Sequence, residues 1–304
     1  MLSEVDRVEQ ERRELLTPEG RRLVFHVAGP AKGDLLFFHT GTPAISYLYA
    51  GMIRECAARG LRIACIARPG YGGSDRAQGR SYADSPTDTA IVADALGAET
   101  FFAIGHSGGG GPALADAALL PERARAVAVG AAFAPRLAMG PEWRKGLEPV
   151  NGEELEAIEA GESTLRAYLE GLAVGMRKIK TGEQITGDPD FGRIYAPVDR
   201  KCFQGEFLDF ALRSFRLLGN ESVDGWIDDD FALFGDWGFD LSQVVIPTAI
   251  WLGGKDNIIP VAHAEWFAAN IPGARLHLYP EEGHVSLINH HFGAMLDELI
   301  ELGS

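Results

Sequence analysis

The 304-residue sequence has few cysteines and no long apolar segment. Its three cysteines, Cys56, Cys65 and Cys202, form no CxxC pair, and one stays unpaired in any disulfide scheme. Cys65 lies in the apolar run LRIACIAR, which favours a buried free thiol. No run approaches the ~20 apolar residues that span a bilayer, and the first sixteen residues are charged throughout, unlike a signal peptide. These absences predict a reduced, cytoplasmic protein without a membrane span.

Basic residues are also scarce relative to acidic ones. The chain has 28 Lys and Arg against 43 Asp and Glu, which gives a net charge of −15 at pH 7. Such a surface repels phosphate backbones and anionic membranes, so we expect neither a nucleic-acid nor a membrane partner. Metal-ligand spacings are missing too, since His290-His291 lack an HExxH pattern and Asp228–Asp230 lack EF-hand spacing. We expect no metal or other cofactor, with Asp228–Asp230 capping a helix or forming a solvated acidic face.

Short apolar segments alternate with helix-sized segments along most of the chain. The predicted strands are nearly continuous in apolar residues, as is typical of parallel strands covered on both faces. They are Leu23–Val27, Leu35–Phe38, Leu61–Ala67, Phe101–Ile104, Ala126–Phe133, Thr248–Leu252 and Leu276–Tyr279. Helices are predicted at Thr87–Leu96, Gly109–Leu120 and Val261–Ala269, and a last one from about Ile288 to Leu299. This order predicts an open α/β sheet with helices on both faces.

The alternation stops after Pro135 and resumes only near Val244. Two helical stripes fill the interval, Leu155–Ile179 and Phe203–Leu218. Gly161-Glu162-Ser163 interrupts the first stripe, with Ser163 as the expected N-cap. We therefore predict an α/β core of residues 1–135 and 244–304, with a helical cap of residues 136–243 inserted between two of its strands.

A candidate nucleophile follows the predicted strand Phe101–Ile104. Gly105-His106-Ser107-Gly108-Gly109 has the pattern G-x-S-x-G, and a helical segment comes next. A sharp strand-to-helix turn forces strained backbone geometry on the serine, so its flanking residues must be small. The spacing and context favour a nucleophilic serine at 107 over a glycine-rich turn with an incidental serine.

A serine hydroxyl needs a base to remove its proton and an acid to orient that base. Asp256 comes just after the predicted strand Thr248–Leu252, and His284 lies in a loop beyond the next strand. The order Ser107, Asp256, His284 is the order expected for a serine, an acid and a histidine on such a sheet. The non-catalytic alternatives are that Asp256 only forms a turn and that His284 is a solvated loop residue.

The chain resembles the α/β-hydrolase superfamily, in particular its serine hydrolases with a helical cap. The resemblance rests on GTP (41–43), RPGYGGSD (68–75), GHSGGG (105–110), GGKDNIIP (253–260) and EEGHVSL (281–287), which occur in that order. It implies an eight-stranded, mostly parallel sheet, a cap after the sixth strand and a catalytic triad. The stretch 225–242 also resembles a group of bacterial hydrolases with poorly defined substrates. RPGYGGSD lacks P-loop spacing, so we expect a structural turn there.

An oxyanion hole requires two backbone N–H groups. The N–H of Gly108, directly after the nucleophile, is the first candidate. Relatives read H-G-x-P in the loop that supplies the second, so the resemblance nominates Thr42, with Thr40 or Gly41 as substitutes. Thr40 stands where the family usually has histidine, and a role for His39 stays open.

Three residues are candidates for the substrate pocket: Thr40, His106 and Trp226. His106 is equally explained as a residue that fixes the turn around Ser107, and Trp226 as ordinary packing within the cap. The cap controls the shape of the pocket, but helical stripes do not resolve the directions of its side chains.

These residues predict hydrolysis of an ester or related acyl bond of a small molecule through an acyl-serine intermediate. Serine at 107 argues against haloalkane dehalogenase and epoxide hydrolase chemistry, which use an aspartate in this superfamily. Alternatives with the same triad are C–C bond hydrolysis and an aminopeptidase-like reaction, for which Glu154, Glu156 and Asp228 are candidate acids. A non-catalytic ligand-binding protein is the alternative from a different class. Neither the oligomeric state nor the substrate's identity follows from the sequence.

Overall fold

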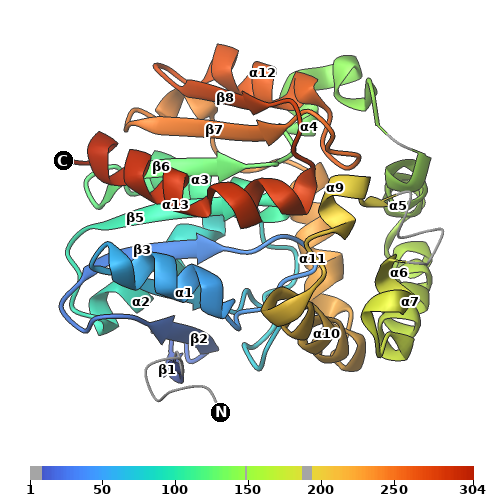
Figure 1. Ribbon diagram of the computed structural model, residues 1–304, viewed down its shortest axis with the longest axis horizontal. Coiled ribbons are helices and arrows are strands. Elements are labelled where there is room, and N and C mark those ends of the chain that lie inside the picture. The colour runs from blue at the N-terminus through green and yellow to red at the C-terminus, as the bar shows by residue number, and fades with distance from the viewer. Residues whose placement is uncertain (1–8, 148, 187–193) are drawn as a thin grey trace.

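The computed structural model describes residues 9–147, 149–186 and 194–304, and its centre is an eight-stranded sheet (Figure 1). Residues 1–8, part of the charged N-terminal stretch, lie outside the described residues. The strands run across the sheet in the order β1-β2-β4-β3-β5-β6-β7-β8. They are β1 (Gln10–Leu16), β2 (Arg22–Ala28), β3 (Asp34–His39), β4 (Leu61–Ile66), β5 (Phe101–His106), β6 (Ala124–Gly130), β7 (Thr248–Gly253) and β8 (Arg275–Tyr279). The predicted fold class, a mostly parallel eight-stranded sheet flanked by helices, is confirmed.

Among the strands of the described residues, β1 at the edge of the sheet is the one that the sequence does not predict. Its sequence, QERRELL, is largely charged and mostly exposed. It pairs antiparallel with β2 over its whole length, from Gln10 opposite Ala28 to Leu16 opposite Arg22. β2 and β4 are also antiparallel, whereas every strand pair from β3 to β8 is parallel. Charged side chains are typical of an edge strand, because they discourage pairing with other chains.

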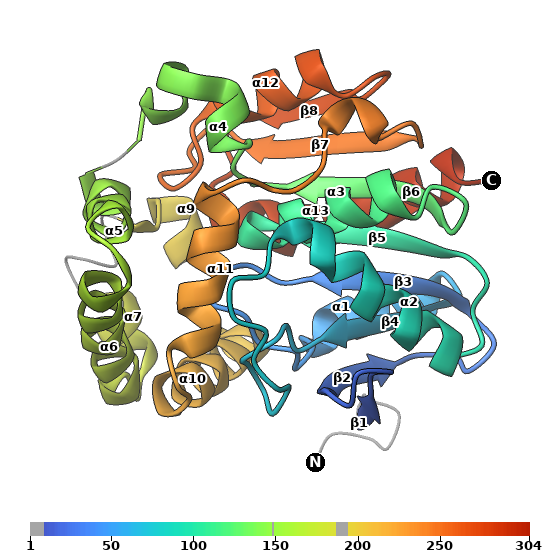
Figure 2. The same cartoon turned by 180° about the vertical axis from the view of Figure 1, so that it is seen from behind.

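Helices cover both faces of the sheet. α1 (Ala50–Ala58) and α13 (His284–Leu302) lie on the face nearest the viewer in Figure 1. α2 (Ser85–Ala95) and α3 (Gly110–Leu119) lie on the opposite face, which Figure 2 shows from the front. α12 (Val261–Asn270) packs against β7 and β8. Both faces of the sheet are therefore buried, which explains the nearly continuous apolar strands.

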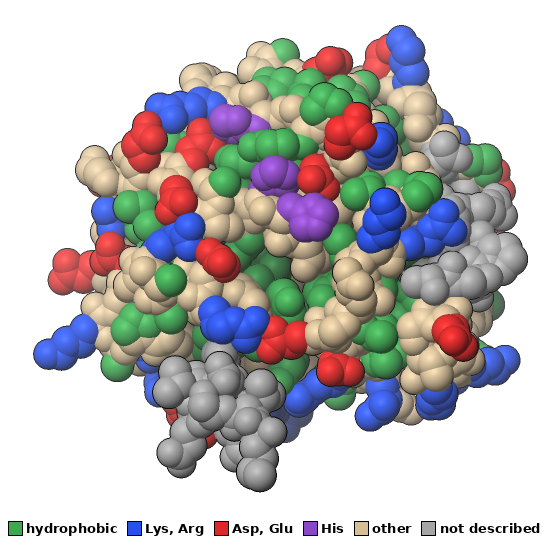
Figure 3. All heavy atoms as spheres, in the orientation of Figure 1, with side chains coloured by type: hydrophobic (Ala, Val, Ile, Leu, Met, Phe, Trp, Pro, Cys, Tyr) green, Lys and Arg blue, Asp and Glu red, His purple; other side chains and the backbone are tan. Residues whose placement is uncertain are grey.

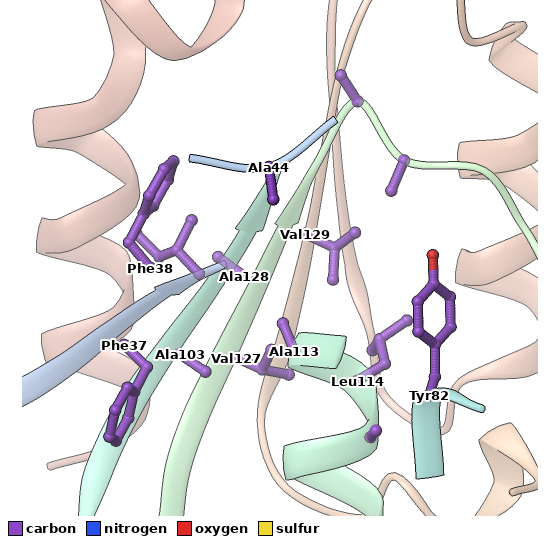
Figure 4. Packing of buried hydrophobic residues seen from close by; sticks show 14 of the residues in the cluster. Phe37, Phe38, Ala44, Tyr82, Ala103, Ala113, Leu114, Val127, Ala128 and Val129 are labelled. Atoms are coloured by element: carbon purple, nitrogen blue, oxygen red, sulfur yellow. The ribbon is translucent and has the colours of Figure 1, made fainter. Parts of the chain in front are cut away.

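The core lies between the sheet and these helices (Figure 4). Phe37, Ala103 and Val127 come from three adjacent strands and are almost fully buried. Ala113 and Leu114 of α3 pack over this part of the sheet and are fully buried too. The first turn of α3 contains Gly110 and Gly111, whose lack of a Cβ allows Ala132 and Tyr82 to approach closely. This packing holds the start of α3, and with it the turn at Ser107, against the sheet.

Between β6 and β7 the described chain forms helices only, as the sequence predicts. They stand beside the arrowhead ends of the parallel strands (Figure 1), and α11 lies between those ends and α5 and α6 (Figure 2). The helices of this segment are α4 (Arg136–Met139), α5 (Pro149–Glu159), α6 (Glu162–Lys178), α7 (Gly182–Thr186), α9 (Pro197–Arg200), α10 (Gly205–Asn220) and α11 (Asp224–Phe234), with short 3-10 turns at Gly140–Arg144 and Leu241–Gln243. The division into a core and a cap at residues 136 and 243 stays a prediction.

The start of α6 and the state of the cysteines differ in how well they match the sequence-based predictions. The break expected at Gly161-Glu162-Ser163 is present, since α5 ends at Glu159 and α6 begins at Glu162, but Gly161, with φ +102°, is the N-cap of α6, and Ser163 lies inside the helix. The prediction of Ser163 as the N-cap is therefore wrong. All three cysteines are free and buried, as expected of a buried thiol at Cys65. No helix among the described residues is long and apolar enough to cross a bilayer.

Candidate active site

Three parallel strands deliver the predicted triad to one edge of the sheet. Ser107 directly follows β5, Asp256 lies three residues after β7, and His284 follows the loop after β8. Because β5, β6, β7 and β8 are parallel neighbours, their carboxyl ends share this edge. Ligands of open α/β sheets bind at such an edge.

Ser107 occupies a strained turn between β5 and the first helical turn of α3. Its φ of +56° lies in the left-handed region, where a non-glycine residue costs about 1–2 kcal/mol. The turn is tight, since a Cβ on Gly105 would stand 2.3 Å from the Gly109 carbonyl oxygen. A Cβ on Gly109 would stand 2.0 Å from the carbonyl oxygen of His39 in β3. The small residues around Ser107 are thus required by contact, and the positive end of the dipole of the helix that follows lies beside the serine.

Asp256 and His284 are joined by a hydrogen bond. His284 Nδ1 donates to Asp256 Oδ2 at 2.8 Å, and both side chains are nearly inaccessible to solvent. The other carboxylate oxygen, Oδ1, accepts from the backbone N–H groups of Ile258 at 2.7 Å and Ile259 at 2.9 Å. Burial alone would lower the pKa of His284, but the charge and hydrogen bond of Asp256, with the charge of Asp199, raise it above its ordinary value. The aspartate therefore fixes the tautomer that leaves Nε2 free to accept a proton.

Ser107 and His284 line two cavities that meet at the serine. One, of about 260 Å³, is bounded by Tyr47, Tyr49 and the three phenylalanines Phe207, Phe210 and Phe215 of α10, and we call it the aromatic cavity. The other, of about 400 Å³, is bounded by Glu154, Tyr168, Trp226 and Asp230, and we call it the acidic cavity. Thr42 borders both of them. The site thus has room on two sides of one serine.

The loop after β3 packs directly against the turn at Ser107. A Cβ on Gly41 would stand 3.1 Å from the Ser107 Cβ, and a Cβ on Gly108 would stand 2.9 Å from the backbone nitrogen of Thr42. The Thr40 hydroxyl donates to the Ile45 carbonyl oxygen at 3.0 Å. The N–H groups of Gly108 and Thr42, the two nominated oxyanion donors, therefore belong to backbones in contact beside the serine.

Arg68 and Asp229 hold this loop in place, and neither role was found from the sequence. Arg68 donates to the carbonyl oxygens of Thr40 at 2.6 Å and Gly41 at 2.9 Å. Asp229, from α11, accepts from Arg68 Nε at 3.0 Å and from the Thr42 hydroxyl at 3.1 Å. The Tyr71 hydroxyl, at 3.0 Å, and Arg80 also donate to Asp229. The RPGYGGSD turn is structural, as predicted, and its arginine fixes the loop that carries Thr42.

The expectation that Asp228–Asp230 form a helix cap or a solvated acidic face is wrong. The three side chains lie within α11 and are 3%, 0% and 1% exposed. Asp228 forms a two-pronged ion pair with Arg76, at 2.7 and 3.0 Å, and Asp229 pairs with Arg68 and Arg80. α11 is buried on nearly all sides, so its acidic residues need partners or a cavity. The signal that could have found them is the group of arginines at 68, 76 and 80 in an otherwise acidic chain.

Asp199 is a second buried aspartate that the sequence did not single out. It is fully buried in α9, which lies beside the first turn of α13 (Figure 1). Its carboxylate accepts from the backbone N–H groups of His284 at 3.1 Å, Val285 at 2.8 Å and Ser286 at 2.8 Å. A Cβ on Gly283 would stand 2.3 Å from Asp199 Oδ2, so glycine is needed there. Asp199 therefore caps the helix whose first residue is His284.

Of the remaining candidate residues, some border one of the two cavities and others do not. His106 donates from Nε2 to the His284 carbonyl oxygen at 3.0 Å, and burial lowers its pKa to about 3, so it is neutral. It also borders the aromatic cavity, as does Thr40, and Trp226 borders the acidic one. His39 turns to Asp116 of α3 at 2.9 Å and borders neither cavity. His290 and His291 both face Glu282, and the described residues contain no cluster suited to a metal ion.

The model of the Alpha/beta hydrolase family matches residues 35–298, which cover the strands and loops of this site. The chain therefore belongs to the alpha/beta hydrolase family. Among curated proteins it is similar to the pimeloyl-[acyl-carrier protein] methyl ester esterase of Nitrosomonas europaea. The two are 25% identical over 270 residues, which cover 87% of this chain and 94% of the relative.

Solved structures share the fold at low sequence identity. The bromoperoxidase of Bacillus anthracis superposes with a TM-score of 0.68 at 18% identity, over 96% of this chain and all of that one. An esterase of Exiguobacterium antarcticum superposes with a TM-score of 0.66 at 20% identity, over 96% and 100% of the two chains. The family match and the similarity to an esterase together show that this chain is a hydrolase.

Proposed function

We propose that the protein is a serine hydrolase that cleaves an ester of a small molecule through an acyl-serine intermediate. The observation that carries the proposal is the 2.8 Å hydrogen bond between His284 and Asp256, beside a serine with φ +56° that shares two cavities with that histidine. A strained, partly exposed serine next to an oriented imidazole is the arrangement that nucleophilic catalysis requires.

In the proposed reaction the Ser107 hydroxyl attacks the ester carbonyl carbon while His284 Nε2 takes its proton. The carbonyl oxygen becomes an oxyanion, which the N–H groups of Gly108 and Thr42 stabilise. His284 then gives the proton to the leaving alcohol oxygen, and the C–O bond breaks to leave the acyl-serine. Water, deprotonated by His284, attacks the acyl-serine, and the collapse returns the proton to Ser107 and releases the acid. No step uses a metal or cofactor.

We also propose that residues 136–243 act as a cap over a core formed by 1–135 and 244–304. The two cavities support this, because α5, α6, α10 and α11 contribute their outer walls and the strand-end loops contribute their floor. The cap thus selects substrates by shape and charge.

The curated relative is by name a methyl ester esterase, and this supports ester chemistry over the alternatives. No residue of the site favours C–C bond hydrolysis. An aminopeptidase-like reaction has a specific observation in its favour, since Glu154 and Asp230 are paired carboxyl groups in the cavity next to Ser107. Glu156 is exposed and Asp228 pairs with Arg76, so neither of these other candidate acids borders the site.

Turnover of a substrate panel tests the proposal. Short and medium-chain p-nitrophenyl esters and the matching p-nitroanilides are assayed with the wild type and with Ser107→Ala. We expect ester hydrolysis by the wild type and a loss of at least a thousandfold in kcat for Ser107→Ala, with an unchanged circular dichroism spectrum. Unchanged turnover in a folded Ser107→Ala protein overturns the proposal, and hydrolysis of amides at rates equal to esters favours the aminopeptidase-like reaction.

A further inference from the structure

The acidic cavity contains two carboxyl groups that the proposed chemistry does not use. Asp230, from α11, is 1% exposed, and Glu154, from α5, is partly buried. Both line the cavity that contains Ser107 and His284. Asp230 Oδ2 is buried there without a hydrogen-bond partner among the described residues. The Trp226 indole N–H lies beside both carboxyl groups and only partly opposes the rise in their pKa. A buried carboxylate oxygen without a partner inside a cavity indicates that a hydrogen-bond donor binds there in use.

The two carboxyl groups differ from their neighbours in having no cationic partner. Asp228 and Asp229, next in sequence to Asp230, pair with arginines. Among residues 9–147, 149–186 and 194–304, no Lys, Arg or His side chain forms an ion pair with Glu154 or Asp230. Burial, followed by repulsion from Glu154 and Asp229, raises the pKa of Asp230 well above its ordinary value. Burial likewise raises the pKa of Glu154 to about 7.

A cation bound in the cavity would offset the cost of ionising Glu154 and Asp230. Unpaired buried charges are costly, and two carboxylates that face one cavity repel each other. An ammonium group has three N–H donors, enough to bond both carboxylates at once. Tyr168 and Trp226 border the same cavity and offer aromatic faces that attract cations. On the visible face of the molecule, by contrast, acidic and basic side chains are interspersed (Figure 3).

We propose that Glu154 and Asp230 form a subsite for a protonated amine on the substrate, while the aromatic cavity receives its apolar part. The proposal rests on the proposed function and narrows its substrate to an amine-bearing ester or a related acyl compound. Ser107 lies where the two cavities meet, so the bond that is cleaved would lie between the amine and the apolar group.

Binding to the Ser107→Ala protein tests the subsite without turnover. The probes are benzylammonium and its neutral analogue benzyl alcohol, with dissociation constants from ligand-observed NMR titrations at pH 7.5. We expect benzylammonium to bind at least tenfold more tightly than benzyl alcohol. Glu154→Gln and Asp230→Asn, each added to Ser107→Ala, should reduce this preference to threefold or less. Glu154 is partly exposed, so its variant carries the test if the Asp230 variant does not fold.

Glu156→Gln is the matched control, because Glu156 is exposed on the same helix and borders neither cavity. This variant should keep the full preference for benzylammonium. Equal binding of the two probes by Ser107→Ala overturns the proposal, as does an equal loss of preference in Glu154→Gln and Glu156→Gln.

A separate measurement distinguishes the failure of this subsite from the failure of the proposed function. Labelling of the wild-type serine by a fluorophosphonate reports on the nucleophile and does not depend on the amine. Labelling together with equal probe binding would reject the subsite alone. A preference for benzylammonium without labelling would reject the serine hydrolase and retain an amine-binding site.

Discussion

Asp199 accepts a hydrogen bond from the backbone N–H of His284 at 3.1 Å, although the two residues are 85 positions apart in the chain. The same carboxylate accepts from Val285 and Ser286, so a residue between β6 and β7 caps the helix that begins with the proposed base. Its charge also contributes to the raised pKa of His284. We infer that Asp199 is a positioning residue for His284.

Replacing Asp199 should therefore change both the rate and its pH dependence. In Asp199→Ala the three backbone N–H groups lose their acceptor, and a displaced His284 should lower kcat roughly 10- to 100-fold with a smaller change in KM. Loss of the negative charge should move the acidic limb of the kcat/KM profile to lower pH. Asp209→Ala, an exposed aspartate of α10, is the control. A lower melting temperature of Asp199→Ala without any change in its pH profile would show that Asp199 has a purely structural role.

The pH dependence of the wild type follows from His284. The base must be neutral to accept a proton, and its pKa lies above the ordinary value of 6.5. Activity should therefore fall as the pH drops through a midpoint above 6.5. Asp256→Asn removes the main group that raises this pKa, so the midpoint should move down while kcat falls by about 10³–10⁴-fold. An acidic limb that stays in place in a folded Asp256→Asn protein would contradict the assignment of His284 as the base.

Arg68 should affect the rate through the loop that carries Thr42. Arg68→Lys keeps the charge near Asp229 but loses the forked donors to the Thr40 and Gly41 carbonyl oxygens. A misplaced oxyanion donor should lower kcat by about 10²-fold, since removing such a donor costs 10²–10³. Arg76→Lys is the control, because Arg76 pairs with Asp228 and makes no contact with the loop. Equal kinetics in the two variants would mean that the loop keeps its shape without the guanidinium.

Two glycines should respond in opposite directions to alanine. Gly105→Ala places a Cβ 2.3 Å from the Gly109 carbonyl oxygen, so the turn at Ser107 must shift, with a loss of both stability and activity. Gly152 lies within α5, and a Cβ there would meet nothing within 4 Å. Gly152→Ala should raise the free energy of unfolding by about 0.5–1 kcal/mol. Chemical denaturation measures both changes, and destabilisation by Gly152→Ala would contradict the packing of α5.

The local parts of this site could be predicted from the sequence, because they depend on neighbours in the chain. The small residues around Ser107 and the turns after two apolar strands mark where Ser107, Asp256 and His284 lie. Strand β1 could not be predicted, since its charged sequence pairs with β2 only because an edge position is open. Asp199 and Asp229 could not be assigned either, because their partners are distant in sequence and meet only in the folded chain.

The central claim is that Ser107 is an activated nucleophile, and covalent labelling tests it most directly. The wild type is incubated with a fluorophosphonate at pH 8, and the adduct is located by peptide mass spectrometry. We predict one label per chain, on Ser107, with none in Ser107→Ala and at least a hundredfold slower labelling in Asp256→Asn. A folded wild-type protein whose Ser107 stays unlabelled, or labels no faster than in Asp256→Asn, would contradict the account.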